Sequence, residues 1–112
     1  MRGLSWRGEG GEEKIVVFVP KPLRVNNKTD YYPMKVDRLD HLVLTVKDLD
    51  ATCRFYAAVL GLEVVTFGEM RKALACDSMR IHLHEAGQEF EPKAHQPTPG
   101  CADLCFLVST SR

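Results

Sequence analysis

Alternating apolar and polar positions predict a β-strand at Leu39 to Val46. Side chains of a strand point to opposite faces in turn, so this segment has two unequal faces. One face is uniformly apolar and consists of Leu42, Leu44 and Val46. The other consists of Leu39, His41, Val43 and Thr45. We expect the apolar face to pack under a helix and the face with His41 to meet more polar surroundings.

A helix is predicted directly after this strand, from Leu49 to Leu60. Asp48 or Asp50 can accept hydrogen bonds from the free amides of its first turn. Gly61 suits the left-handed conformation in which many helices end. Apolar side chains at helical spacing form a single stripe of Leu49, Cys53, Tyr56 and Leu60. This stripe is the face that we expect to cover the strand.

Three further strands are expected after the helix, at Leu62 to Phe67, Lys72 to Cys76 and Met79 to Glu85. The order strand, helix, strand, strand, strand is a βαβββ unit, which makes the fold class α+β. Another alternating segment, Ala102 to Val108, predicts one more strand. Its apolar side consists of Ala102, Leu104, Phe106 and Val108.

Potential metal ligands lie on the less apolar faces of three of these strands. They are His41, then His82 and His84, which share a side opposite Ile81 and Leu83, and then Asp103. Histidines from separate strands on one side of a sheet can together bind a metal ion. The alternatives are a buried core histidine for His41, a solvated strand face for His82 and His84, and turn or capping hydrogen bonds for Asp103. Arg71 can contact an anionic substrate or form a surface salt bridge.

The segment LDHLVLTVKDLDATCRFYAAVLGLEV, Leu39 to Val64, resembles the vicinal oxygen chelate superfamily of glyoxalase I, bleomycin-resistance proteins and extradiol dioxygenases. Similarity to glyoxalase domain-containing proteins continues through RKAL (71–74), LHEAGQEFEPKA (83–94) and PGCADLCFLV (99–108). The resemblance implies two βαβββ modules around a metal-containing cleft. This chain would supply one glyoxalase-like module and the first strand of an incomplete second module.

The resemblance also implies a set of metal ligands. His41 stands where the family has a ligand on the first strand, and His82 best matches the ligand on the last strand of the first module. His84 lies two residues further on the same face. Asp103 stands where the second module commonly supplies a histidine. A fourth ligand, a glutamate on the last strand of the second module, has no counterpart before Arg112.

Two functions are compatible with this resemblance. The first is a glyoxalase I-like lyase, isomerase or dioxygenase that uses zinc, nickel or iron, without an organic cofactor, on a small oxygenated substrate. In such chemistry the metal polarises oxygens while a carboxylate moves the proton, and the missing glutamate leaves the catalytic residue unidentified. The second is a non-catalytic or vestigial binding domain with an incomplete metal site. A truncated splice form or an incomplete gene model would account for a chain that stops within its second module.

The chain is expected to divide into a mostly disordered segment 1–35, a glyoxalase-like domain 36–108 and a tail 109–112. Met1 to Met34 is rich in Gly, Lys, Asn and Pro, and Ile15 to Val19 is its one candidate strand. A domain of fewer than about 80 residues has a marginal core when alone. A folded chain is therefore expected to form a homo-oligomer such as a dimer.

Composition excludes several classes of partner. Lys plus Arg and Asp plus Glu both number 15, and no basic patch indicates nucleic acid. No apolar run approaches the roughly 20 residues that span a membrane. The four cysteines lack a C-x-x-C spacing and are expected to be reduced thiols, which favours the cytoplasm. A mitochondrial presequence is the alternative, although acidic residues at 9, 12 and 13 argue against it.

Overall fold

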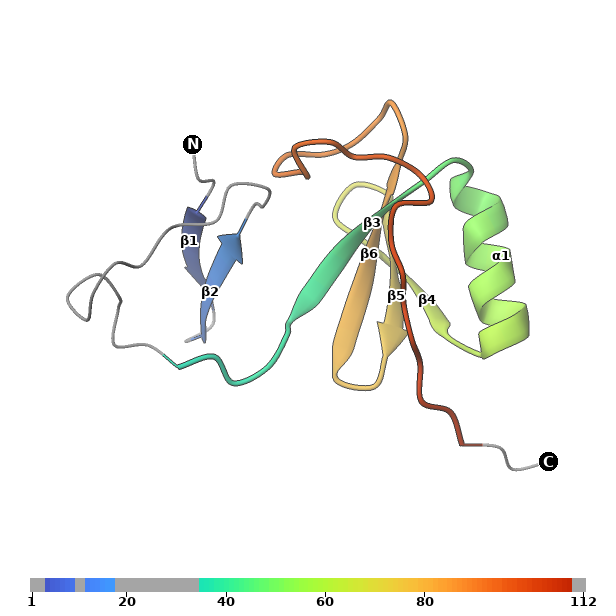
Figure 1. The fold of residues 1–112 in the computed structure, drawn as a ribbon, viewed down its shortest axis with the longest axis horizontal. Helices are drawn as coiled ribbons and strands as arrows, with labels where there is room; N and C mark the ends of the chain where they lie inside the picture. The colour runs from blue at the N-terminus through green and yellow to red at the C-terminus, as the bar shows by residue number, and fades with distance from the viewer. Residues whose placement is uncertain (1–3, 10–11, 18–34, 110–112) are drawn as a thin grey trace.

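The computed structural model of the chain describes residues 4–9, 12–17 and 35–109. From residue 35 onward it forms a four-stranded sheet with one helix, as Figure 1 shows. The elements are β3 (His41–Val46), α1 (Leu49–Leu60), β4 (Glu63–Phe67), β5 (Arg71–Cys76) and β6 (Met79–Glu85). The predicted βαβββ order and the α+β class are confirmed.

The order of strands in the sheet is β3-β6-β5-β4. β3 and β6 run parallel, because α1 carries the chain from the end of β3 across to the far edge, where β4 begins. The other two pairings, β4 with β5 and β5 with β6, are antiparallel hairpins. β3 and β4 are therefore the two edges of this sheet within the described part of the chain.

The ends of α1 follow from local sequence. Of the two candidate caps, Asp48 is the one used: its Oδ1 accepts a hydrogen bond from Ala51 N at 3.0 Å. The first turn has a second acceptor from the sheet, since Leu49 N donates to Glu85 Oε2 at 3.0 Å. At the other end Gly61 has φ 70° and its N–H reaches Ala57 O at 3.1 Å. The predicted helix limits are confirmed.

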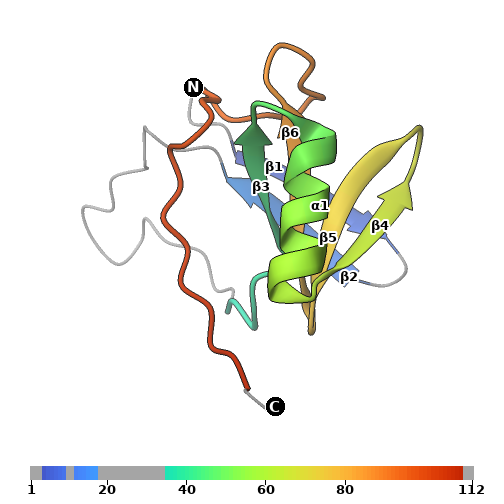
Figure 2. The ribbon, with the colours of Figure 1, turned by 90° about the vertical axis from the view of Figure 1, so that its right-hand side faces the viewer.

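The core lies between α1 and the sheet, and Figure 2 shows the helix lying across the strands. Leu74 and Ile81 are fully buried there, and each contributes roughly 1.5–3 kcal/mol through burial of its side chain. The remaining members of the buried cluster come from β3, α1 and β6, and they are Val46, Cys53 and Leu83. The predicted apolar face of β3 and the helical stripe thus pack against each other, with Leu42, Leu44 and Tyr56 at the margin.

An antiparallel hairpin precedes this module. β1 (Leu4–Glu9) pairs with β2 (Glu12–Val17), in register from Leu4 opposite Val17 to Glu9 opposite Glu12. The prediction of one isolated strand at Ile15 to Val19 is corrected, because its backbone groups find partners in β1. Residues 18 and 19, and the rest of the segment to 34, lie outside the described residues. The disorder expected for that segment stays a prediction.

The strand predicted at Ala102 to Val108 is wrong. Residues 101–109 belong to neither sheet, although Leu104 and Phe106 pack against the core cluster as the alternation predicts. Side-chain alternation identifies which residues turn inward, but a strand also needs a neighbouring backbone to hydrogen-bond with. No such ladder to these residues occurs within the described part of the chain. Leu107 is consequently 99% exposed.

Candidate functional site

The sheet surface opposite α1, which we call the open face, carries the predicted histidines. The β3–β6 register pairs Val43 with His82 and Thr45 with His84, so these side chains share a face with His41. Leu42 and Ile81 pair on the other side, under α1. His41 therefore points away from the interface between sheet and helix, as the sequence predicts.

His41 and His82 form a close pair on the open face. Their ring centroids are 4.0 Å apart and their planes differ by 11°, so the two rings are stacked. They come from neighbouring parallel strands and are offset by two residues in register, since His41 lies opposite Arg80. Two of the four predicted site residues are thereby brought together.

Asp40 orients the first member of this pair. Its Oδ2 lies 2.7 Å from His41 Nδ1. In the tautomer that donates Nδ1–H to this carboxylate, the lone pair of Nε2 is free to bind a metal. A carboxylate behind a histidine ligand is a frequent arrangement in metal sites because it fixes the ring and raises its basicity. The sequence analysis did not single out Asp40, although its position next to His41 was the available signal.

His82 is kept neutral by its surroundings. Its ring also packs against Phe67 of β4, with centroids 4.8 Å apart. Burial of the ring, followed by the neighbouring His41, lowers the pKa of His82 from 6.5 to about 4. A histidine must be neutral to bind a metal, so His82 is in the competent state at neutral pH.

His84 lies two residues further along β6 and has different neighbours. Only 7% of it is exposed, and its Nδ1 is buried without a hydrogen-bond partner among the described residues. Phe90 contacts it edge-on, with ring centroids 5.8 Å apart. The guanidinium carbon of Arg71 lies over the Phe90 ring, 4.3 Å from its centre. Burial, and then the charge of Arg71, lowers the pKa of His84.

Asp103 is exposed on the segment that follows the loop 86–100. Its neighbours Leu104 and Phe106 face the helix side of the module, where they contact the core cluster. Within the described ranges, no group of three or more His, Cys, Asp or Glu side chains is arranged to hold a metal ion. The structure thus brings His41 and His82 together but does not show Asp103 beside them.

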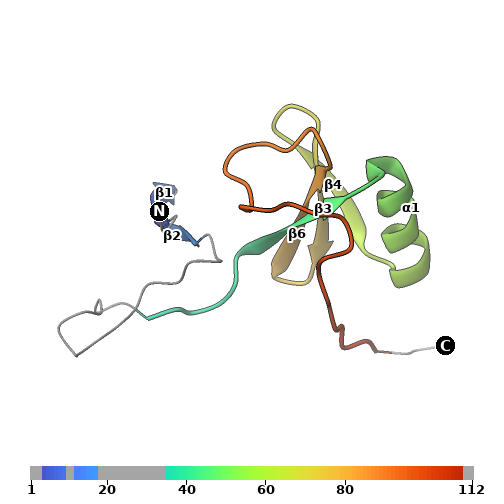
Figure 3. The same ribbon diagram turned by 45° about the horizontal axis from the view of Figure 1, so that its top comes forward.

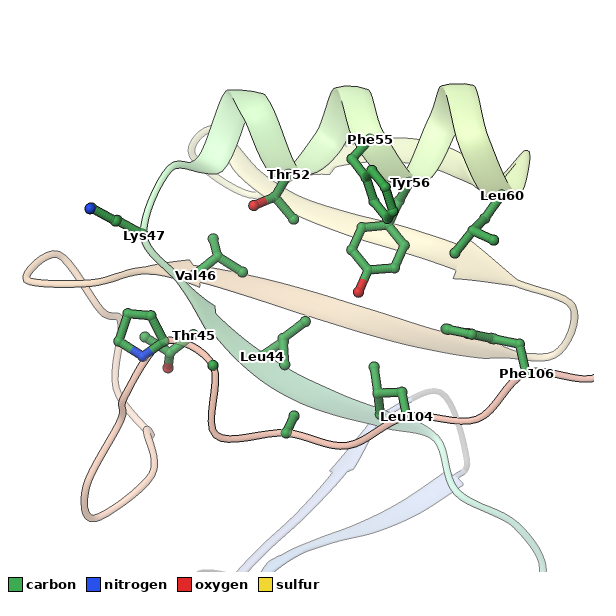
Figure 4. A pocket seen from close by; sticks show the side chains of 13 residues that line it. Leu44, Thr45, Val46, Lys47, Thr52, Phe55, Tyr56, Leu60, Leu104 and Phe106 are labelled. Carbon is green, nitrogen blue, oxygen red and sulfur yellow. The ribbon is translucent and has the colours of Figure 1, made fainter.

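A pocket of about 460 Å³ lies on the helix side of the module, and Figure 4 shows the side chains that line it. Leu44 of β3, Tyr56 of α1 and Leu104 point into it from three segments. Tyr56 also meets Phe106 at 6.5 Å between ring centroids. Sequence reasoning assigned these residues to the core and did not predict a pocket, because the placement of 101–109 is not visible in a local pattern.

Residues 38–109 match the family model described as Glyoxalase/Bleomycin resistance protein/Dioxygenase superfamily. The chain belongs to this superfamily. The predicted resemblance is confirmed, and the match covers the whole βαβββ module together with the segment 101–109.

Two curated relatives are similar to this chain, and one of them is named as a glyoxalase-domain protein. Virulence protein STM3117 of Salmonella typhimurium is 58% identical over 77 residues, which make up 69% of this chain and 54% of that protein. Glyoxalase domain-containing protein RDO1 of Mycosarcoma maydis is 53% identical over 78 residues, 70% of this chain and 44% of that protein. The chain thus spans about half the length of the curated relatives that it matches.

Solved structures agree with this fold. The crystal structure of the Salmonella virulence protein matches with a TM-score of 0.67 at 58% identity, over 70% of this chain and 62% of that one. An integron cassette protein from the mobile metagenome of V. cholerae matches with the same TM-score at 50% identity, over 71% and 62% of the two chains. In the described part of this glyoxalase-superfamily chain, no helix is long and apolar enough to cross a membrane.

Proposed function

We propose that this chain supplies His41 and His82 as ligands of a divalent metal ion in a glyoxalase-type enzyme. The reaction would be that of a metal-dependent lyase, isomerase or dioxygenase on a small oxygenated substrate. The observation that carries the proposal is the stacking of the two imidazoles on the open face, 4.0 Å apart. Zinc, nickel and iron are the metals that suit imidazole ligands.

Each residue has a separate role in this proposal. Asp40 holds the ring of His41 through Nδ1. Burial keeps His82 unprotonated at neutral pH, since the pKa is near 4. When bound, the metal supplies Lewis-acid polarisation of substrate oxygens. The parallel ladder between β3 and β6 fixes both ligands on a rigid part of the sheet.

His84 and Asp103 are the further candidate ligands. His84 lies on the same face, but its contacts are with Phe90 and Arg71 rather than with the His41–His82 pair. Asp103 would complete a set of two histidines and one carboxylate, which is the pattern of iron(II) oxygenases. Asp103 is exposed on the segment 101–109, so this segment would have to move for Asp103 to bind the same metal ion as the two histidines.

A second function is favoured by one specific observation. The described residues hold no group of three or more metal-ligating side chains. Such an incomplete set of ligands is expected of a domain that keeps the glyoxalase fold but binds no metal stably. The second candidate is therefore a non-catalytic or vestigial binding domain.

The proposal includes self-association and a reducing compartment. Among the described strands, β3 is at an edge of the four-stranded sheet, and such an edge can pair with another chain. A core of five buried residues supports a single module only weakly. Sedimentation velocity is expected to give a dimer or larger species, and a compact monomer that melts cooperatively would contradict this. Four free thiols, at Cys53, Cys76, Cys101 and Cys105, support a cytoplasmic location.

Calorimetric titration with Ni²⁺ or Zn²⁺ tests the metal proposal. Wild type should bind about one ion per His41–His82 pair. Loss of a group that only supports a metal ligand lowers metal affinity by roughly tenfold to hundredfold. His41→Ala removes a proposed ligand itself, so it should lower metal affinity by at least that much. His95→Ala is the matched control, because His95 is exposed in the loop 86–100 and makes no ring contact with the pair. Circular dichroism should be similar for all three. Failure of folded wild type to bind either ion would instead favour the vestigial domain.

A further inference from the structure

The unpartnered nitrogen of His84 is the feature of the open face that the assignment of His41 and His82 as metal ligands does not explain. This side chain is more than nine-tenths buried, and its Nδ1 has no hydrogen-bond partner in the described part of the chain. Buried polar groups in folded proteins nearly always have a partner. A buried nitrogen that lacks one within its own fold is suited to a partner from outside, such as an oxygen of a ligand.

Arg71 brings a positive charge to the same place. In the β5–β6 register Lys72 lies opposite Leu83. Arg71 and His84 are the next residues along these two strands, so they lie side by side on the open face. After burial, the charge of Arg71 is the next largest cause of the lowered pKa of His84. Its guanidinium lies over the ring of Phe90 and forms no ion pair with another described residue. A cation–π contact orients a guanidinium but does not neutralise it.

Phe90 covers this group from a loop. It contacts both partners, His84 edge-on and Arg71 through its ring face. The segment 86–100 that carries it contains neither helix nor strand. In Figure 3 this loop lies on the side of the sheet away from α1. Phe90 thus joins the side chains of His84 and Arg71 into one group on this face.

We propose that Arg71 and His84 bind the carboxylate group of a small ligand beneath Phe90. The guanidinium supplies charge and a planar fork of N–H donors, which matches a carboxylate, and His84 supplies one further N–H in the tautomer protonated at Nδ1. Identification of this ligand as the substrate rests on the proposed function. In that case the enzyme acts on a carboxylic acid whose reacting oxygens reach toward the His41–His82 pair, about 7 Å along the strand.

Two acidic side chains near His84 oppose an anion. The charges of Glu89 and Glu91 raise the pKa of His84, whereas the charge of Arg71 lowers it. Glu89 is half-buried and accepts a hydrogen bond from Gly87 N at its Oε2 at 3.0 Å. Glu91 is exposed, so water and salt screen its charge. Glu89→Gln is accordingly expected to strengthen carboxylate binding.

The test uses the full chain stripped of metal with a chelator, so that it does not depend on the metal proposal. Acetate and acetamide, which have nearly the same shape and differ in charge, are titrated while NMR follows the ring of His84 and the Nε–H of Arg71. Acetate should shift both signals saturably, and acetamide should bind at least about tenfold more weakly. Arg71→Gln should weaken acetate binding by about tenfold, with Arg71→Lys intermediate because it keeps charge but not the fork.

Arg54→Gln is the matched control, since Arg54 is an exposed arginine on α1. It should leave acetate binding unchanged. Equal shifts by acetate and acetamide, or full acetate affinity in a folded Arg71→Gln protein, would overturn the proposal. If Arg71→Gln does not fold, the comparison of the two ligands on wild type decides. If the chain binds acetate but takes up no Ni²⁺, the carboxylate site is supported and the proposed metal function is contradicted.

Discussion

On the α1 side of the sheet, Leu74 and Ile81 are fully buried in apolar contacts, whereas on the open face the buried residue His84 has a nitrogen without a partner. Both faces consist of the same strands, and every β3 and β6 residue contributes to one or the other. The helix-side residues are explained by packing. The position of His84 is not, because a polar atom removed from water without a hydrogen bond lowers stability.

This difference indicates which residues are retained for a purpose other than folding. Polar residues that reduce stability tend to be found at functional sites. His84, whose buried Nδ1 has no hydrogen-bond partner among the described residues, has this character. Substitutions can therefore separate the faces: those on the helix side should affect folding, and those on the open face should affect binding.

The largest expected effect is on the helix side. Ile81→Ala removes a fully buried side chain and should lower the free energy of unfolding by about 2–5 kcal/mol. Chemical denaturation followed by circular dichroism measures this. Val43→Ala is the open-face control, because Val43 is 41% exposed on the neighbouring strand and should lose less than about 1 kcal/mol. Equal losses in the two variants would remove the distinction between the faces.

On the open face, the two β6 histidines should differ in their effect on metal affinity. His82→Ala removes a member of the stacked pair and should weaken Zn²⁺ binding by about a hundredfold, while His84→Ala should weaken it by about tenfold or less. Competition with a chromophoric chelator gives both affinities. The reverse order would assign the ligand role to His84 and contradict the carboxylate site inferred above.

A smaller effect is expected at the start of α1. Asp48→Ala deletes the cap that accepts from Ala51 N and should cost about 1 kcal/mol of stability. Asp50→Ala, in the same turn but without the cap bond, should cost only a few tenths of a kcal/mol. Thermal melts of the metal-free protein compare the two. Metal affinity should remain at the wild-type value in both variants, since neither lies on the open face.

The smallest effect is a dependence of stability on pH that comes from the open face. The pKa of His82 is lowered to about 4 in the folded chain, so between pH 6.5 and 4 the unfolded chain binds more protons than the folded one. Stability of the metal-free protein should be complete above pH 6.5 and should fall as the pH drops toward 4. His82→Gln should flatten this part of the curve of melting temperature against pH. An unchanged slope would mean that His82 is not buried as described.

Local patterns in the sequence predicted the module well because their causes are local. The helix from Leu49 to Leu60 follows from its stripe, its Asp48 cap and Gly61, and the faces of β3 follow from alternation alone. Alternation likewise placed His41, His82 and His84 on one face. The family resemblance selected His82 as the partner of His41, and the two rings are stacked.

Features that depend on contacts between distant parts of the chain could not be predicted from local sequence patterns. The strand expected at Ala102 to Val108 requires a backbone partner, which no local pattern specifies. Likewise, Phe90 reaches Arg71 and His84 from a loop without regular structure, and nothing in its neighbouring residues predicts that contact. The pairing of β1 with β2 was missed because only one of its strands has an evident apolar run.

X-ray absorption spectroscopy of the zinc-loaded chain tests the central claim most directly, because it counts the imidazoles bound to the metal. The account predicts two imidazoles per zinc in wild type, two in His84→Ala and one in His41→Ala. His95→Ala, the exposed control, should also show two. A count that is unchanged in His41→Ala, or that falls in His84→Ala, would contradict the assignment of the stacked pair on the open face as the metal ligands.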